Sequence, residues 1–516
     1  MGGEWWRSAV IYQIAPRSFQ DGNGDGMGDL AGISARLDYV ASLGVDAVWI
    51  TPFFASPMAD FGYDVADYRA VDPLFGTMAD FDRLLDKAHG LGLKIIIDMV
   101  WSHSSDAHPW FAHSRNRGDK ADWYVWADPK PDGSPPNNWL AVFGGPAWSW
   151  EPRRRQYYLH HFLPSQPALN WRNPELAEAL LAAGRFWLDK GVDGFRLDAV
   201  DFMLHDGALR DNPPRPGPVP AKPFGMQDHV HDMVQPEALD VLARIRALMI
   251  EYPGTITMAE LSSTGDPVAR AGAYTGGAHM HLAYSLGLMR RPFTPAALTA
   301  IIAQVATAQG RLAWAFENHD VERSVSRWGD GSPDCAAMML ALLLALEGGL
   351  CLYQGQELGL PEADLPRDRL RDPYGMAFWP EFKGRDGCRT PMPWRHDAPH
   401  AGFSSVEPWL PVADSHYELA VDVQEQDGAS PLNTLRRLLR WRKRHSALLD
   451  GDTQLVDMGP QVVAFRRGGT MLCVFNPSAN PVRLALPAMP AEGVGYRMDG
   501  TELVFDSWGA AFIPVG

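Results

Sequence analysis

Acidic side chains recur in this sequence at the points where apolar segments end. Asp198 closes the segment GFRLD, Glu260 closes TITMAE, and Asp320 closes AFENHD. Carboxyl groups held together can divide the work of bond cleavage, one as nucleophile or base and another as proton-donating acid. A single acidic residue at such a point often only caps the next helix. Several in succession predict a shared catalytic site.

Arg196 stands two residues before Asp198 in the same apolar segment. Side chains alternate with a period of two along a strand, so the guanidinium and the carboxylate are expected on one face. A nearby guanidinium favours the ionised carboxylate, which a nucleophile requires. For these two residues alone, a structural ion pair is the alternative interpretation. Glu260 and the pair His319–Asp320 favour the catalytic one.

The segments that carry these residues belong to a repeated pattern. An amphipathic helix and a glycine lead into a nearly continuous apolar strand, which predicts a parallel sheet covered on both faces. Seven units of this kind are visible, so we expect closure as an eight-stranded (β/α)8 TIM barrel, with an open doubly wound sheet as the alternative. In such a barrel, catalytic groups lie at the carboxyl ends of the strands. The strand-like segments are 9–19, 45–52, 93–103, 192–201, 255–261, 311–320 and 348–360.

Two stretches interrupt the repeat and a third follows it. Residues 104–168, rich in Pro, Gly and Trp, are too many for a plain loop and predict an inserted subdomain after the third strand. The Pro- and Gly-rich segment 358–420 is a candidate wall of the site. Short strands with turns near the end predict a C-terminal antiparallel β-sandwich at 451–516. The catalytic barrel is then expected over 1–103 and 169–450.

Composition narrows the classes of function. The 516 residues carry 46 Lys and Arg against 62 Asp and Glu, a net charge of −16. This balance argues against a nucleic-acid partner and against an anionic membrane surface. No apolar run reaches membrane-spanning length, and the start lacks the pattern of a signal peptide. Four cysteines without a C-x-x-C pair indicate neither a zinc site nor a disulfide framework. A cytoplasmic protein is the default expectation from these observations, and we expect a monomer or a homodimer.

The segment DGNGDGMGD is a candidate cation loop. Asp21, Asn23, Asp25 and Asp29 stand at positions 1, 3, 5 and 9 of an EF-hand-like loop, with the Met27 carbonyl at position 7. The glutamate of position 12 is missing. Oxygen ligands suit one structural Ca²⁺ or Mg²⁺, and a solvated acidic turn is the alternative. Nothing in the sequence indicates an organic cofactor.

Taken together and in this order, the strand-end motifs resemble the conserved regions of the α-amylase family, glycoside hydrolase family 13. The resemblance covers essentially the whole chain, including the barrel, the insertion and the C-terminal β domain. The segments GYDVADY, QPALNW and GRDGCRTPMPW are similar to the α-glucosidase and oligo-1,6-glucosidase branch.

The resemblance implies a role for each strand-end residue. Asp198 matches the nucleophile, Glu260 the general acid/base, and Asp320 the third carboxylate, which binds sugar hydroxyls in the transition state. Tyr63 would stack on the sugar ring, and Asp60 with Arg385 would close the pocket around the far hydroxyls. Asp98 matches a residue that supports the site. The full set of substrate-binding residues is Asp60, Tyr63, His103, Phe162, Arg196, His319 and Arg385.

The resemblance also implies a function. We expect a retaining exo-α-glucosidase that removes terminal glucose from short oligosaccharides or α-glucosides, a small-molecule substrate class. In this branch a small residue after the nucleophile, here Ala199, accompanies α-1,4 preference. A transglucosylase or sugar isomerase that uses the same glucosyl-enzyme is the alternative. A non-catalytic protein or sugar-binding module on this fold is disfavoured because all three carboxylates are present.

Overall fold

The computed structural model describes residues 4–515, so residues 1–3 and 516 of the expected domains lie outside the described residues. Eight parallel strands form one sheet in the order β11-β10-β9-β5-β2-β1-β13-β12. In chain order they are β1 (Val10–Ile14), β2 (Ala47–Ile50), β5 (Lys94–Met99), β9 (Gly194–Leu197), β10 (Ile256–Leu261), β11 (Leu282–Ser285), β12 (Ala313–Ala315) and β13 (Gly349–Tyr353).

The sheet closes on itself between β11 and β12. The Ala283 amide donates to the Arg311 carbonyl at 3.1 Å, and Ala283 forms a parallel bridge with Leu312. Closure confirms the (β/α)8 barrel and excludes the open sheet, whose outer strands would stay unpaired. The sequence predicts seven of these strands. It does not reveal β11, because its four residues LAYS are too few to form a recognisable apolar run.

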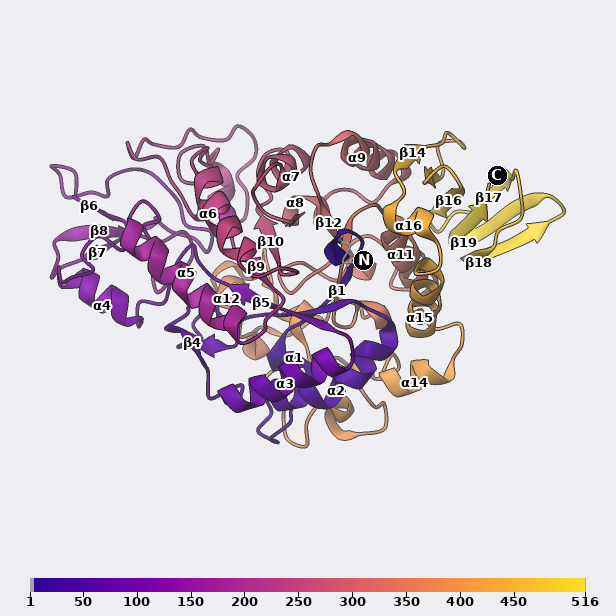
Figure 1. Cartoon of the computed structure of the whole chain (residues 1–516), viewed down its shortest axis with the longest axis horizontal. Coiled ribbons are helices and arrows are strands. Elements are labelled where there is room, and N and C mark those ends of the chain that lie inside the picture. Colours follow the sequence, from indigo (N-terminus) through magenta and orange to yellow (C-terminus); the bar gives the residue numbers. More distant parts are fainter. Residues whose placement is uncertain (1–3, 516) are drawn as a thin grey trace.

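A helix follows each barrel strand and covers the outside of the sheet (Figure 1). Their first turns are well capped. Asn173 accepts hydrogen bonds from two amides of α5, and Thr77 forms a capping box with Asp80 at the start of α3. In the described part of the chain, no helix has the length and apolar character needed to cross a membrane. The eight helices are α2 (Leu30–Leu43), α3 (Met78–Gly90), α5 (Pro174–Asp189), α6 (Ala238–Ile250), α7 (Pro267–Thr275), α9 (Pro295–Thr307), α11 (Pro333–Ala345) and α15 (Pro431–Arg442).

Each barrel strand divides its side chains between two cores. On β5, Ile96 packs with Ile11 and Trp49 inside the barrel. Its neighbours Ile95 and Ile97 pack outward in the larger core that includes the surrounding helices. Both faces of the strands are therefore apolar, which explains their continuous apolar sequence.

The stretch after β5 forms a separate small layer. It contains α4 (Pro109–Arg115) and a three-stranded antiparallel sheet of β6 (Trp126–Ala127), β8 (Gln156–Leu159) and β7 (Trp148–Glu151). A further antiparallel pair, β3 (Phe54–Ala55) with β4 (Asp67–Val71), lies between β2 and α3. Figure 1 places β6, β7 and β8 at the end of the molecule opposite the C-terminal sheet.

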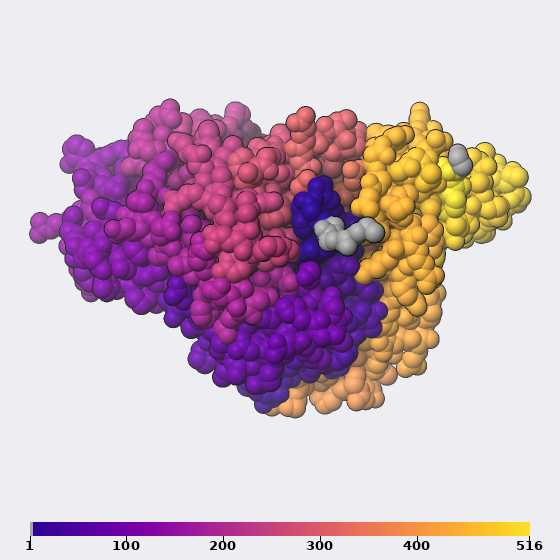
Figure 2. Space-filling view, viewed as in Figure 1, coloured from indigo at the N-terminus to yellow at the C-terminus, as the bar shows by residue number. Residues whose placement is uncertain are grey.

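The C-terminal region is one six-stranded antiparallel sheet, where the sequence predicts a two-sheet sandwich. One face packs on the barrel through Phe465 and Phe475, and the other encloses its own core with Val474 and Phe505. The sheet forms this second core because β19 is long enough to pair with three strands. In Figure 2 these residues project from one end of the molecule. The strands are β14 (Thr453–Leu455), β15 (Val463–Arg467), β16 (Met471–Asn476), β17 (Val482–Ala485), β18 (Glu492–Asp499) and β19 (Glu502–Pro514).

Residues 203–237 form a second long connection, between β9 and α6, which the sequence pattern does not reveal. Apart from a short 3-10 helix at Pro223–Met226 it has no regular structure. The segment after β13 carries α12 (Pro373–Phe378) and α14 (Val421–Gln426). The remaining short helices are α1 (Pro16–Phe19), α8 (Leu286–Met289), α10 (Ser324–Arg327), α13 (Asp414–Tyr417) and α16 (Ser446–Asp450).

Two buried arginines bind the carboxyl end of α11. Arg442 on α15 donates to the Leu344 carbonyl at 3.0 Å. Arg467 on β15 donates to the Ala345 carbonyl and, at 2.8 Å, to the Gly451 carbonyl. Cations near a helix carboxyl end satisfy free carbonyls and oppose the helix dipole. Arg467 therefore ties the C-terminal sheet to the barrel.

Replacement of this tie is expected to destabilise the protein. Arg467→Met leaves the Ala345 and Gly451 carbonyls without their charged donor, so we expect a loss of about 2–4 kcal/mol of unfolding free energy. Arg466→Met is the matched control, since Arg466 is exposed on the same strand. Chemical denaturation measures both variants. Equal stability of the two variants would contradict the role of Arg467.

Candidate active site

A cavity of about 350 Å³ opens at the carboxyl ends of the barrel strands. Two of the ten expected site residues, Arg196 and His319, lie behind its wall and are 0% and 3% exposed. Both are held by other protein groups, and their expected substrate-binding role stays a prediction. The eight that line the cavity are Asp60, Tyr63, His103, Phe162, Asp198, Glu260, Asp320 and Arg385.

Arg196 on β9 is the centre of the polar contacts. Its Nη1 donates to Asp98 Oδ1 at 2.7 Å and to Asp198 Oδ1 at 2.8 Å. Its Nη2 lies 2.6 Å from Glu260 Oε1. These acidic groups belong to three neighbouring strands of the barrel, β5, β9 and β10. One rigid guanidinium thus sets the distance between Asp198 and Glu260.

Glu260 receives two further hydrogen bonds. The Tyr284 hydroxyl donates to Oε1 at 3.0 Å, and the Ala199 amide donates to Oε2 at 3.1 Å. Ala199 adopts φ 45° and ψ 45°, a left-handed conformation that is uncommon for a residue with a side chain. This turn directs the amide at Glu260 immediately after Asp198 leaves the strand.

Asp98 supports the site from the side that faces away from the cavity. Its second oxygen, Oδ2, accepts from Trp49 Nε1 at 3.2 Å and from the Tyr63 hydroxyl at 3.1 Å. Asp98 is 1% exposed, so its charge is satisfied only by protein groups. It thereby anchors Arg196 on the side away from the cavity.

Arg385 closes one end of the cavity. Its Nη2 donates to Asp60 Oδ1 and to Asp372 Oδ1, both at 2.8 Å, and its Nη1 donates to Asp320 Oδ1 at 3.0 Å. Arg389 also donates to Asp320 Oδ1, at 2.7 Å. These contacts join three chain segments that are far apart in the sequence.

Both expected histidines are held by protein groups. His319 Nδ1 contacts Gln13 at 2.7 Å, and Nε2 lies 2.7 Å from the Tyr63 hydroxyl. His103 Nε2 lies 2.9 Å from the Tyr63 carbonyl, and burial lowers the pKa of His103 to about 4. His103 is therefore neutral at physiological pH. Tyr63 lies between the two histidines, with its ring parallel to that of His319.

The two central carboxyl groups are pushed toward their protonated forms. Burial raises the pKa of Glu260 to about 7 against the opposing charge of Arg196, and the charges of Asp198 and Asp320 add to the rise. Burial likewise raises the pKa of Asp198 to about 7, with Arg196 opposing. Near neutral pH the protonation of one carboxyl group therefore depends on that of the other. One group can be protonated and act as the acid while the other is ionised.

Asp320 behaves differently. Burial disfavours its charged form, but His319 and the guanidinium groups of Arg385 and Arg389 outweigh burial and hold its pKa far below the usual range. Asp320 is therefore a permanent carboxylate and cannot serve as the acid. The site contains one fixed negative charge beside a pair that exchanges protons.

Several residues of the site are absent from the sequence-based set. Tyr284 lies on β11, the strand that the sequence does not reveal. Arg389 and Asp372 lie in the segment after β13 and hold Asp320 and Arg385. The segment 203–237 contributes part of the cavity wall, including Lys222 and Phe224. Of these residues, only Arg389 could have been suspected from the sequence, because it stands four residues after Arg385 in the segment GRDGCR.

The candidate cation loop contains the expected oxygens. Asp21, Asp25 and Asp29 each accept backbone amides of the loop, and the Met27 carbonyl accepts no backbone hydrogen bond from the described residues. Burial raises the pKa of Asp29, and the charges of Asp21 and Asp25 raise it further. The donor set therefore fits a hard divalent cation, because a cation would relieve this repulsion.

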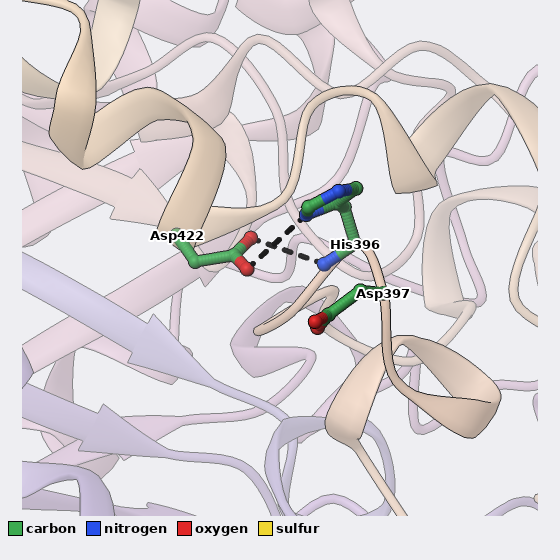
Figure 3. Close-up of side chains that lie close together, drawn as sticks. All are labelled: His396, Asp397 and Asp422. Atoms are coloured by element: carbon green, nitrogen blue, oxygen red, sulfur yellow. Dashed lines mark hydrogen bonds and ion pairs between the residues drawn. The ribbon is translucent and has the colours of Figure 1, made fainter.

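The carboxylates of this loop do not come close enough together to form a compact ligand group. Among the described residues, the group whose ligand atoms all come within 4.8 Å is His396, Asp397 and Asp422, shown in Figure 3. That group is largely exposed, and Arg395 Nη2 already contacts Asp397 at 3.0 Å. It is therefore an ordinary surface ion-pair cluster. A cation in the loop at 21–29 would draw its carboxylates closer together.

The coupling between the two carboxyl groups is measurable by ¹³C NMR of the side-chain carboxyls. In Asp198→Asn the pKa of Glu260 is expected to fall below about 7, because the negative charge of Asp198, which disfavours ionisation of Glu260, is removed. Asp240→Asn is the control, since Asp240 is exposed on α6. An unchanged or raised pKa of Glu260 in Asp198→Asn would contradict the coupling.

Comparison with known proteins agrees with this geometry. The family model of the α-amylase catalytic domain matches residues 13–451. A probable α-glucosidase of Rhizobium meliloti (strain 1021) is 50% identical over 99% of this chain and 97% of its own. An oligo-1,6-glucosidase of Heyndrickxia coagulans is 37% identical over 88% of each chain. The solved structure of the α-glucosyl transfer enzyme XgtA has a TM-score of 0.94 at 53% identity, covering 99% of each chain.

The matched region contains the end of β1, the other seven barrel strands and the small layer of α4, β6, β7 and β8. It also contains Asp198, Glu260 and Asp320. The chain belongs to the α-amylase family of glycoside hydrolases.

Proposed function

We propose that this enzyme is a retaining exo-α-glucosidase that releases terminal glucose from short α-linked substrates. The observation that carries the proposal is the pair Asp198 and Glu260, held at a fixed distance by Arg196 at the cavity wall. Retaining glycosidases use two carboxyl groups close together, one as nucleophile and one as acid/base. The names of the two curated relatives support the same substrate class.

Asp198 is the proposed nucleophile. Its carboxylate attacks the anomeric carbon, while protonated Glu260 gives its proton to the leaving glycosidic oxygen. Glu260, now ionised, then takes a proton from water, and that water releases the sugar from Asp198. Arg196 stabilises the negative charge as it moves between the two groups, because it contacts both.

The closed end of the cavity supports exo action. Arg385 joins Asp60, Asp320 and Asp372, so a chain cannot continue past this point. Asp60 and Asp320 line the cavity and present acceptors to the hydroxyls of one terminal glucose. The small side chain of Ala199 at the cavity wall supports the proposed preference for α-1,4 over α-1,6 linkages.

Transfer to an acceptor other than water is the second candidate. It would use the same glucosyl-enzyme, and the similarity to the α-glucosyl transfer enzyme XgtA favours it. The cytoplasmic location is a proposal supported by four buried free cysteines, which suit a reducing compartment. A monomer or homodimer also stays a proposal.

The loop at 21–29 is proposed to hold one structural Ca²⁺ or Mg²⁺ through Asp21, Asn23, Asp25, the Met27 carbonyl and Asp29. Support comes from the oxygen-only donor set and from Asp29, whose pKa is raised by burial and further by the charges of Asp21 and Asp25. The Ser404 hydroxyl donates to Asp21 Oδ2 at 2.6 Å, so the loop also contacts the segment after β13. The cation would stabilise that contact without entering the reaction.

Cation binding is expected to raise thermal stability. Addition of Ca²⁺ or Mg²⁺ to chelator-treated enzyme should raise Tm and release or absorb heat in calorimetry, and Asp25→Asn should abolish both effects. Asp397→Asn, in the surface cluster of Figure 3, is the control. Absence of heat and of any Tm change in the treated wild type would refute the cation site.

Turnover is expected to depend on both carboxyl groups in different ways. Asp198→Asn should lower kcat by about 1,000-fold or more on every α-glucoside, because no covalent intermediate forms. Glu260→Gln should lower kcat on maltose far more than on an aryl α-glucoside, whose leaving group needs little protonation. Asp240→Asn is the folded control. Asp198→Asn activity within about tenfold of wild type would exclude Asp198 as the nucleophile.

A further inference from the structure

The charges that line the cavity are unevenly distributed. Its carboxylates are Asp60, Asp198, Glu260 and Asp320, which belong to the catalytic cluster already described. The remaining charged lining residues, apart from Arg385, are cations contributed by the segment 203–237 and by the end of α8: Arg215, Lys222 and Arg290. This part of the cavity wall is therefore positive, although the whole chain carries a net charge of −16.

Two of these cations have no carboxylate partner among the described residues. Arg215 is neutralised by Asp228 at 2.8 Å. Lys222 and Arg290 form no ion pair in the part of the chain that the structure describes. Lys222 is half-buried, with Nζ 4.2 Å from the ring centre of Phe382 and 4.9 Å from that of Tyr374. Burial lowers its pKa to about 8, and the charges of Arg290 and Arg385 lower it further.

Hydroxyl donors accompany the two cations. Ser262, Ser263 and Thr264 line the cavity directly after β10, the strand of Glu260. Arg290 Nη1 lies 3.4 Å from Ser263 Oγ. Ammonium, guanidinium and hydroxyl groups on one wall are the donors that bind phosphate or carboxylate oxygens. Like charges brought together without a counter-ion are stabilised when an anion binds between them.

We propose that the outer part of the cavity binds an anionic group on the leaving group of the α-glucoside, a phosphate ester or a carboxylate, through Lys222 and Arg290. This inference rests on the proposed glucosidase function and specifies its substrate class. The terminal glucose occupies the end closed by Arg385. The anion then lies on the far side of Glu260, next to the two cations.

A matched pair of substrates tests the proposal. The compounds 4-carboxyphenyl α-glucoside and 4-carbamoylphenyl α-glucoside have almost the same shape and differ by one negative charge. The wild type is expected to favour the carboxylate in kcat/KM by about tenfold at low ionic strength, and the preference should shrink as salt is added. A second arm compares maltose with maltose phosphorylated at O6 of the reducing glucose, which distinguishes phosphate from carboxylate recognition.

The variants Lys222→Met and Arg290→Gln should each lower the anionic-to-neutral ratio of kcat/KM by about threefold or more, and the double variant by about tenfold. Arg291→Gln is the control, since Arg291 is exposed and lies outside the cavity lining. If Lys222 only clamps its segment to α12, both members of each pair lose activity equally. Such unchanged ratios would overturn the proposal.

A binding arm keeps the test independent of turnover. Calorimetry with Glu260→Gln enzyme measures Kd for the carboxyphenyl and carbamoylphenyl glucosides directly. We expect the carboxyphenyl glucoside to bind more tightly than the carbamoylphenyl glucoside. Adding Lys222→Met and Arg290→Gln should weaken binding of the carboxyphenyl glucoside about tenfold. These two results support the proposal even if neither compound is cleaved. Equal Kd values overturn it. Cleavage of the neutral glucoside without any anionic preference leaves the glucosidase function standing and removes only this inference.

Discussion

A fully buried guanidinium must have its charge balanced by polar partners, and Arg196 meets this need with three carboxylates. Removal from water costs several kcal/mol per ion, so each partner must hold its position closely. That requirement fixes Asp98, Asp198 and Glu260 around one planar group. The geometry needed for two-carboxylate chemistry is thus a consequence of how one buried cation is neutralised.

The barrel meets this requirement because parallel strands bring their carboxyl ends together. Arg196 lies on β9 and Asp198 directly follows it, while Asp98 and Glu260 come from the strands on either side. A second set of ion pairs around Arg385 forms the closed end of the cavity. At Glu260 burial outweighs Arg196 and leaves a proton-exchanging pair, whereas around Asp320 the cations outweigh burial and keep the carboxylate ionised. The site therefore contains both a carboxyl group that can donate a proton and a carboxylate that stays ionised.

The sequence predicts the barrel and the three carboxylates because both are encoded locally, in apolar strands that end in acidic residues. It does not predict β11, whose four residues carry no distinct pattern, and so it misses Tyr284. It misses the segment 203–237 because irregular backbone has no periodicity. It does not predict that Arg196 and His319 are buried behind the cavity wall, because that burial depends on packing that no motif records. In the C-terminal region short antiparallel strands are predicted, but β18, the long β19 and their pairing into one sheet are not.

The central claim is that Asp198 and Glu260 act as a retaining pair in a pocket for one terminal glucose. The most direct measurement follows the anomers released from maltose and isomaltose by ¹H NMR before mutarotation. Our interpretation predicts that α-glucose appears first from maltose, with isomaltose cleaved more slowly. Initial release of β-glucose would contradict the double-displacement assignment, and faster cleavage of isomaltose would contradict the α-1,4 preference.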